Sequence, residues 1–275
     1  MSDYGDMSLL EGIEYFFNAI KQKCFSKEEY AAELLKARGF LLEDNELALS
    51  DNSFFAKNRW TREIIDAPTN DANYLNELLK DQNIGEVQGN RIIIFPNANV
   101  EKIFYSSIQW GSESFLPYGG VDFIRYEHAP KVPVVLLEKF IARYVKAISA
   151  CCVETHGSCD GNHHRPPGRG IFIEISTFMG NLWHKILCER LLYKRFNFRW
   201  LENCKIRINK LNKWRIYVEL NRAAEFLYNH RIEIRQIKCE VCEEIQSGLR
   251  KDKTLDVVKF FSERTNELFD KILIE

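Results

Sequence analysis

The sequence lacks any run of apolar residues that approaches the roughly 18 a membrane-spanning helix needs. It also lacks a Walker phosphate loop, a glycine-rich dinucleotide fingerprint and a haem-attachment motif. The first residues, MSDYGD, are acidic and do not have the basic and then apolar layout of a signal peptide. These absences argue against membrane-spanning, nucleotide-driven and haem proteins, and we expect a soluble, intracellular protein.

A disulfide scaffold is not expected either, because eight cysteines spread over 275 residues are too sparse for one. Cys24, Cys188 and Cys204 stand among apolar residues, where a reduced thiol packs as a small hydrophobic group. With 45% hydrophobic residues, the chain can bury one large core or two small ones. The composition therefore predicts reduced cysteines in a folded protein of one or two domains.

The net charge of −1 conceals opposite charges in different parts of the chain. Residues 1–82 carry 9 Lys or Arg against 16 Asp or Glu, a net charge of −7. Residues 182–238 carry 14 against 5, a net charge of +9. A basic block within an aromatic-rich folded segment is typical of a surface that binds a polyanion, although a solvated charged face gives the same pattern.

Two short segments about a hundred residues apart are similar to each other. Residues 39–45 read GFLLEDN and residues 151–157 read CCVETHG, each at the end of an expected helix. Aligned, Gly39 falls on Cys151 and Asp44 falls on His156. Small and apolar residues followed by a polar tip suit two helices that pack closely and hold chemical groups at their ends.

Hydrophobic periodicity predicts the same order of elements around each segment. A helix over 8–24 precedes both, and Ser26 with Glu29 has the capping-box pattern that opens the first motif helix. After the first motif we expect strands at 47–50 and 59–65, a helix from 68, strands at 84–87 and 91–95, and a helix over 97–107. A linker over 109–133 leads to a helix over 136–155, strands at 158–165 and 171–175, a helix over 182–193, strands at 198–208 and 213–218, and helices over 222–228, 231–248 and 254–273.

This doubled layout, with the two motifs quoted above, resembles the monomeric two-motif LAGLIDADG homing endonucleases, with a degenerate second motif. The resemblance implies an α+β fold of tandem αββαββα repeats with pseudo-twofold symmetry, two antiparallel sheets that form a saddle, and extra terminal helices. The implied divisions are an N-terminal helix (1–25), a first repeat (26–108), a linker (109–133), a second repeat (134–248) and a C-terminal helix (249–275).

The resemblance also implies a site at the two helix tips. Asp44 would be catalytic and would bind Mg²⁺ or Mn²⁺, and His156 would take the second catalytic position. Histidine is a poor ligand for Mg²⁺, which prefers oxygen. The activity implied is therefore a metal-dependent DNA endonuclease or nickase with impaired cleavage, and the alternative is a non-catalytic DNA- or RNA-binding regulator, or an RNA maturase.

Double-stranded DNA is the expected partner, and RNA is the alternative. The basic residues expected to contact it lie mostly on predicted strands, where residues of the same parity share a face. They are Arg59, Arg62, Arg199, Lys205, Arg207, Lys210, Lys213 and Arg215. A solvent-exposed face balanced by Glu202 and Glu219 would explain the second-half residues equally simply.

A different class of protein is also open. His156 with Cys159, and Cys239 with Cys242, are two pairs of zinc ligands at three-residue spacing that could form one tetrahedral site. That site would make the chain a zinc-stabilised interaction protein. Core packing explains Cys239 and Cys242 without zinc, because residues three apart share a face of the helix expected there.

Overall fold

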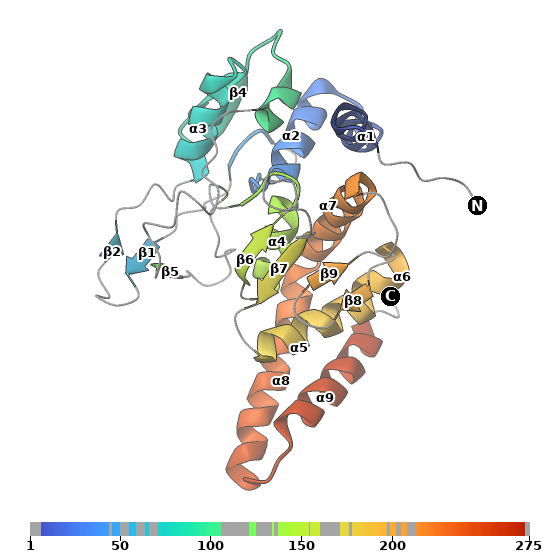
Figure 1. Cartoon of the computed structure of the whole chain (residues 1–275). Coiled ribbons are helices and arrows are strands. Elements are labelled where there is room, and N and C mark those ends of the chain that lie inside the picture. The colour runs from blue at the N-terminus through green and yellow to red at the C-terminus, as the bar shows by residue number, and fades with distance from the viewer. Residues whose placement is uncertain are drawn as a thin grey trace, which may run out of the picture. The chain divides into compact units, whose positions relative to one another are not determined.

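The computed structural model describes residues 7–43, 46–49, 55–58, 64–65, 71–105, 121–124, 134, 137–153, 155–159, 171–175, 178–196, 199–201, 205–207 and 213–272 (Figure 1). The chain divides into two compact units. The N-terminal unit comprises Met1–Lys146 and Lys210–Asn221, and the C-terminal unit comprises Ala147–Asn209 and Arg222–Glu275. Helices α4 (Ala142–Ala150) and α7 (Lys213–Asn229) each contribute residues to both units.

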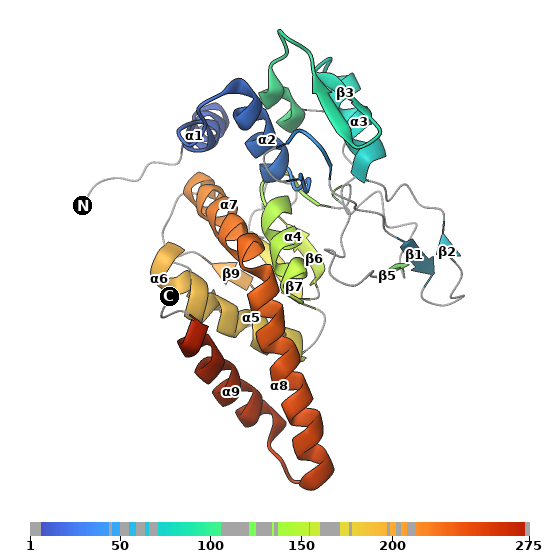
Figure 2. The ribbon, with the colours of Figure 1, turned by 180° about the vertical axis from the view of Figure 1, so that it is seen from behind.

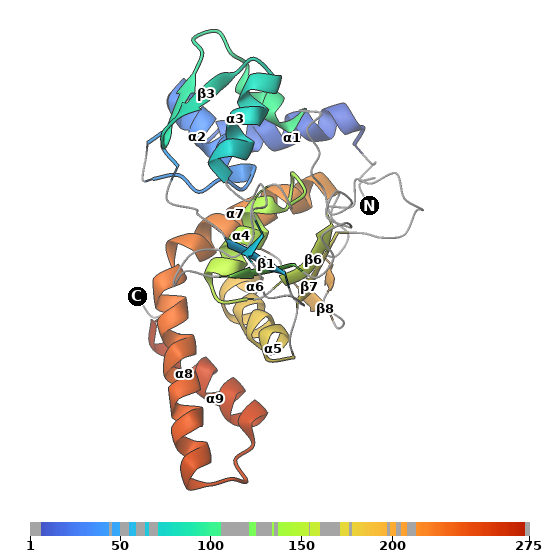
Figure 3. The same ribbon diagram turned by 90° about the vertical axis from the view of Figure 1, so that its left-hand side faces the viewer.

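The N-terminal unit contains helices and short antiparallel strands. Its helices are α1 (Leu9–Lys21), α2 (Lys27–Ala37), α3 (Asp71–Asp81) and the 3₁₀ helix η1 (Val100–Phe104). Its strands are β1 (Phe55–Asn58), β2 (Ile64–Ile65), β3 (Gly85–Gln88), β4 (Arg91–Ile94) and β5 (Val121–Ile124). The β3–β4 hairpin packs on α3, as Figure 3 shows, and β1 pairs with β2 on one side and β5 on the other.

Helix α1 begins at a full capping box. The Ser8 hydroxyl accepts a hydrogen bond from the backbone N–H of Glu11, and the Glu11 carboxylate accepts one from the backbone N–H of Ser8. The buried face of α1 carries Phe16 and Phe17, which pack edge-on against Phe104 of η1. The helix predicted over 8–24 is thereby confirmed, with its end at Lys21.

Helix α2 begins where the sequence predicts. The Ser26 hydroxyl accepts a hydrogen bond from the backbone N–H of Glu29 at 3.0 Å, which confirms the N-cap. The reciprocal bond of a capping box is displaced by one residue, because the Glu29 carboxylate accepts from the N–H of Phe25 at 2.6 Å. The cap therefore satisfies two backbone donors, one of which lies just outside the helix.

The two motif helices end in the same backbone turn. Gly39 has a φ of +102° and Cys152 a φ of +65°. In both turns the N–H of this residue bonds to the carbonyl three positions back, and the next N–H bonds five positions back: Phe40 to Leu35, and Val153 to Ile148. The equivalent positions are thus Gly39 and Cys152, so the alignment of Gly39 with Cys151 is wrong by one residue.

Within the N-terminal unit, the end of α2 lies against the start of α4. The Glu33 carboxylate forms an ion pair of 3.2 Å with Arg143, and a Cβ placed on Gly39 would lie 2.8 Å from the Cβ of Ala142. Glycine at position 39 therefore permits both the left-handed backbone and the close approach of the two helices, because it has no Cβ. This contact involves the start of α4 and not the second motif at its end, so the predicted packing of the two motifs stays a prediction.

The described residues of the C-terminal unit form helices and antiparallel hairpins. Its helices are α5 (Phe178–Leu187), the π-helical turn η4 (Cys188–Leu192), α6 (Tyr193–Phe196), α8 (Arg231–Lys251) and α9 (Val257–Ile272). Its hairpins join β6 (Thr155–Cys159) to β7 (Phe172–Ile175) and β8 (Arg199–Leu201) to β9 (Lys205–Arg207). Helices α8 and α9 lie side by side, and α5 packs on α9 (Figure 2). The rings of Trp183 on α5 and Phe269 on α9 are stacked, with their centroids 5.9 Å apart.

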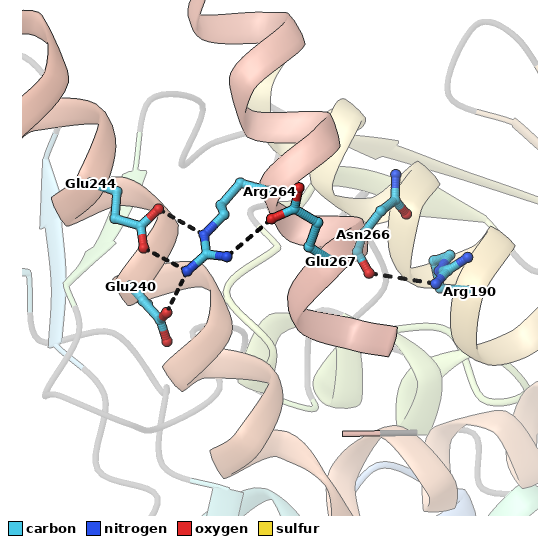
Figure 4. A network of polar contacts seen from close by, with 6 residues as sticks. All are labelled: Arg190, Glu240, Glu244, Arg264, Asn266 and Glu267. Atoms are coloured by element: carbon cyan, nitrogen blue, oxygen red, sulfur yellow. Dashed lines mark hydrogen bonds and ion pairs between the residues drawn. The ribbon is translucent and has the colours of Figure 1, made fainter. Parts of the chain in front are cut away.

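A single arginine joins α8 to α9. Arg264 of α9 donates to both carboxylate oxygens of Glu244 at 2.8 and 2.9 Å and to Glu240 at 3.2 Å (Figure 4). It also donates to Glu267 on its own helix at 3.0 Å. Because a guanidinium can serve several carboxylates at once, Arg264 links the two helices through two ion pairs.

The predicted fold of tandem αββαββα repeats, with two antiparallel sheets forming a saddle, is wrong. Helix predominates among the described residues, and their strands form one three-stranded sheet and separate two-stranded hairpins. Residues 213–218, predicted as a strand, begin helix α7, while the predicted strand over 198–208 contains both strands of the β8–β9 hairpin. The predicted linker over 109–133 contains β5, which pairs with β1.

Candidate nucleic-acid interface

The helix-tip site falls largely outside the described part of the chain. Asp44 is not among the described residues, and of His156 the structure describes the backbone alone. That backbone is irregular: Thr155 pairs with Ile175 and Gly157 with Glu174, so His156 is the extra residue of a β-bulge. The roles predicted for Asp44 and His156, and the binding of Mg²⁺ or Mn²⁺, stay predictions.

The alternative zinc site is also described only in part. Cys239 is exposed and Cys242 half-buried on α8, and burial raises the pKa of the Cys242 thiol. The side chains of His156 and Cys159 lie outside what the structure describes. Within the described residues no three metal-ligating side chains gather, so zinc also stays a prediction.

The β8–β9 hairpin carries three of the predicted basic residues. In its register Arg199 lies directly opposite Arg207, Trp200 opposite Ile206, and Leu201 opposite Lys205. Because residues alternate between the faces of a strand, Arg199, Lys205 and Arg207 lie on one face with Leu201. Trp200 and Ile206 take the alternate positions, so the backbone register assigns the three basic residues to one face of the hairpin, here called the basic face, and Trp200 and Ile206 to the other.

An exposed arginine precedes this hairpin in the chain. Arg195, on α6, lies with its guanidinium carbon 4.5 Å from the ring centroid of Phe226. The imidazole of His230 is stacked with the same phenyl ring at 4.4 Å, and its Nδ1 lies 3.0 Å from the Phe226 carbonyl oxygen. Two flat polar groups at the surface of the C-terminal unit thus contact one aromatic ring. Arg195 was missed because it lies between the predicted helix over 182–193 and the predicted strand over 198–208.

The other predicted basic residues are distributed differently. Lys213 and Arg215 lie two positions apart on helix α7, about 200° around its axis, so the strand-based prediction that they share a face is wrong. Both belong to the N-terminal unit. The structure does not describe Arg59, Arg62 and Lys210, whose predicted contacts with nucleic acid stay predictions.

A buried charge cluster in the N-terminal unit escaped the sequence analysis. Asp71, the first residue of α3, accepts a hydrogen bond from Lys146 of α4 at 2.6 Å and from the backbone N–H of Val134 at 2.8 Å. Asp71 and Lys146 are each 1% exposed. Burial raises the pKa of Asp71 and lowers that of Lys146, since both charged forms lose water. No local pattern marks such a pair, because its members lie 75 positions apart.

Arg38 completes this cluster. It is the C-cap residue of α2, is 2% exposed, and donates from Nη2 to the Tyr74 hydroxyl at 2.8 Å. Its positive charge acts on Asp71 by lowering the pKa that burial raises. The sequence placed Arg38 next to the first motif without giving it a role.

Buried polar chemistry also occurs in the C-terminal unit. His184 of α5 has no solvent exposure, and burial lowers its pKa to about 3. Its Nε2 lies 3.6 Å from the Cys188 sulfur one turn further on. At neutral pH this imidazole is uncharged, which suits a core position and not one that binds phosphate as a cation.

Comparisons with protein-family models, curated proteins and solved structures gave no match to the chain. Among the described residues, none of the helices has the length and apolarity that crossing a bilayer requires.

Proposed function

We propose that this protein binds nucleic acid, with double-stranded DNA as its principal partner, through the basic face of the β8–β9 hairpin and the neighbouring Arg195. The observation that carries the proposal is the cross-strand pair Arg199 and Arg207, with Lys205 on the same face. Like charges directly opposite one another destabilise a hairpin. An anionic partner removes this penalty, which makes the arrangement useful in a bound complex.

The apolar side of the hairpin supports the same proposal. Trp200 and Ile206 occupy one face, so the hairpin can pack on that side while the basic side faces a ligand. Arginine can bind phosphate and the guanine edge in a bidentate way, which lysine cannot. Residues 182–238 as a whole carry a net charge of +9, which favours attraction of a polyanion at long range.

The test is the binding of a fluorescent 20-base-pair duplex measured by anisotropy over a series of salt concentrations. The wild type is expected to show an affinity that falls steeply with salt. The double variant Arg199→Gln/Arg207→Gln is expected to bind at least tenfold more weakly and to lower the salt slope by about 2, one for each lost phosphate contact.

A matched control removes the same charge elsewhere in the C-terminal unit. Lys253 and Lys259 are exposed, and Lys253→Gln/Lys259→Gln is expected to change affinity less than threefold. Equal losses in the two double variants would mean that net charge alone attracts DNA. Absent or salt-independent binding by the wild type would refute the proposal. Single-stranded DNA and duplex RNA competitors decide between the partners.

Cleavage is a separate question from binding. The endonuclease prediction took its geometry from a saddle that this chain does not form. Incubation of bound duplex with Mg²⁺ or Mn²⁺, comparing the wild type with Asp44→Asn, tests it. Identical inert behaviour of the two proteins is the result expected of a protein that binds without cutting.

A further inference from the structure

Among the described residues of the N-terminal unit, the buried charged side chains carry an excess positive charge. Arg38 is 2% exposed, and Asp71 and Lys146 are each 1% exposed. A guanidinium does not lose its proton in proteins, so Arg38 is always cationic. Two cations and one carboxylate therefore leave a net charge of +1 when all three are ionised, in surroundings that water does not reach. A buried charge without a counterion is strongly unfavourable.

The hydrogen bonding of Arg38 is also incomplete. Nη2 donates to the Tyr74 hydroxyl, and the guanidinium carbon lies 5.7 Å from the centre of the same ring. Within the described part of the chain no acceptor meets Nε or Nη1, although both atoms are shielded from solvent. More than nine-tenths of buried polar groups in proteins have a hydrogen-bond partner, so two open donors on one charged group call for an explanation.

The carboxylate of the cluster does not provide these acceptors. One oxygen of Asp71 accepts from the Val134 N–H and the other accepts from Lys146. The three charged residues also come from three different elements: the C-cap of α2, the start of α3 and the interior of α4. Several elements thus place two cations around a single acid whose oxygens are already engaged.

We propose that the Nε and Nη1 groups of Arg38 bind a small oxyanion, a phosphate or sulfate group, inside the N-terminal unit. A tetrahedral oxyanion supplies several acceptor oxygens and the negative charge that the cluster lacks, and guanidinium is well matched to it. Since both nitrogens are covered, the anion enters by local opening of the unit. This site is independent of the nucleic-acid interface, which lies on the C-terminal unit.

The experiment is a thermal unfolding series of the whole chain in phosphate, with chloride at matched ionic strength as the reference. At ten times its dissociation constant, phosphate is expected to raise the Tm of the wild type by about 3–6 °C. Arg38→Met fills a similar volume without charge or donors and is expected to abolish this rise. Arg91→Met removes an exposed arginine of the same unit and is expected to keep it.

A second variant and a second ligand complete the experiment. If Arg38→Met does not fold, Arg38→Lys keeps the charge without Nε and Nη1, and is expected to bind phosphate at least tenfold more weakly by calorimetry. A nucleoside monophosphate that reproduces an Arg38-dependent rise would identify a larger phosphate ester as the source. A rise that is equal in chloride, or that persists in Arg38→Met, would overturn the site. Arg199→Gln/Arg207→Gln is expected to keep the phosphate response whether or not it binds DNA.

Discussion

At the scale of single residues, the two helix-ending turns provide a matched pair of positions. Gly39 and Cys152 share a left-handed backbone, and Cys152 carries a side chain there. At Gly39 an added Cβ would lie 2.8 Å from the Cβ of Ala142 on another helix. Gly39→Ala is expected to destabilise the protein by about 2 kcal/mol or more, from strain and overpacking together. Cys152→Gly relieves strain and is expected to stabilise by up to about 1 kcal/mol. Urea unfolding measures both, and a neutral Gly39→Ala would contradict this account.

His184 gives a pH dependence with a defined sign. Its pKa is lowered to about 3 in the folded chain, whereas an unfolded histidine has a pKa of about 6.5. Between these values only the unfolded chain binds the proton. The free energy of unfolding therefore falls by about 1.4 kcal/mol for each pH unit below 6.5.

Urea midpoints at pH 7, 6 and 5 measure this loss. His184→Gln is expected to remove the corresponding slope, because no titrating group remains at that position. His230→Gln changes an exposed histidine of the same unit and is expected to retain it. Parallel pH profiles for the wild type and His184→Gln would show that the buried imidazole does not control acid stability.

At the scale of elements, Gly12 allows α1 to approach Trp214 of α7 closely. A Cβ on Gly12 would lie 1.9 Å from the indole nitrogen of Trp214, a separation that no side chain can occupy without displacing the ring. Gly12→Ala favours helix by about 1 kcal/mol in isolation but is expected to destabilise the protein by about 1–3 kcal/mol overall. Asn18→Ala, on the exposed side of α1, is the control and is expected to be neutral or stabilising. If the two variants behaved alike, the close packing on Trp214 would be excluded.

The elements also show which parts of the fold could be predicted from the sequence and why others could not. The helices α1, α2, α8 and α9 were predictable because an apolar stripe defines each of them locally, and α1 and α2 also have a serine N-cap. Residues 213–218 were mistaken for a strand because Trp214, Ile216 and Val218 alternate as strand residues do. The buried positions Trp214, Tyr217 and Val218 have helical spacing instead, and the pattern continues to Leu227. A window that ended at residue 218 could not distinguish the two periods.

Of the two candidate sites, one could be predicted in part from the sequence and the other could not. The basic face of the β8–β9 hairpin could be predicted in part, because parity along a strand already groups Lys205 with Arg207. Its pairing with Arg199 required the register of the hairpin. The cluster of Arg38, Asp71 and Lys146 could not be predicted, since these residues come from distant parts of the chain and meet only in the folded unit.

At the scale of the whole molecule, the two units are not consecutive stretches of chain. The N-terminal unit takes residues Lys210–Asn221 from within α7, and these carry Trp214 and Tyr217. Both side chains are fully buried, and Phe140 lies 5.2 Å from the Trp214 ring and 4.8 Å from the Tyr217 ring. Part of the core of the first unit is therefore synthesised only after much of the second.

A fragment of residues 1–146 is consequently expected not to fold by itself. Removal of a buried aromatic side chain costs about 3–5 kcal/mol, so loss of both Trp214 and Tyr217 approaches the roughly 5–15 kcal/mol that stabilises a whole domain. Circular dichroism of the fragment should show no cooperative thermal transition, and a peptide of residues 210–229 should restore one. The same peptide with alanine at positions 214 and 217 should not. A cooperative transition of the fragment alone would mean that the first unit is complete without α7, and that the division of the chain lies elsewhere.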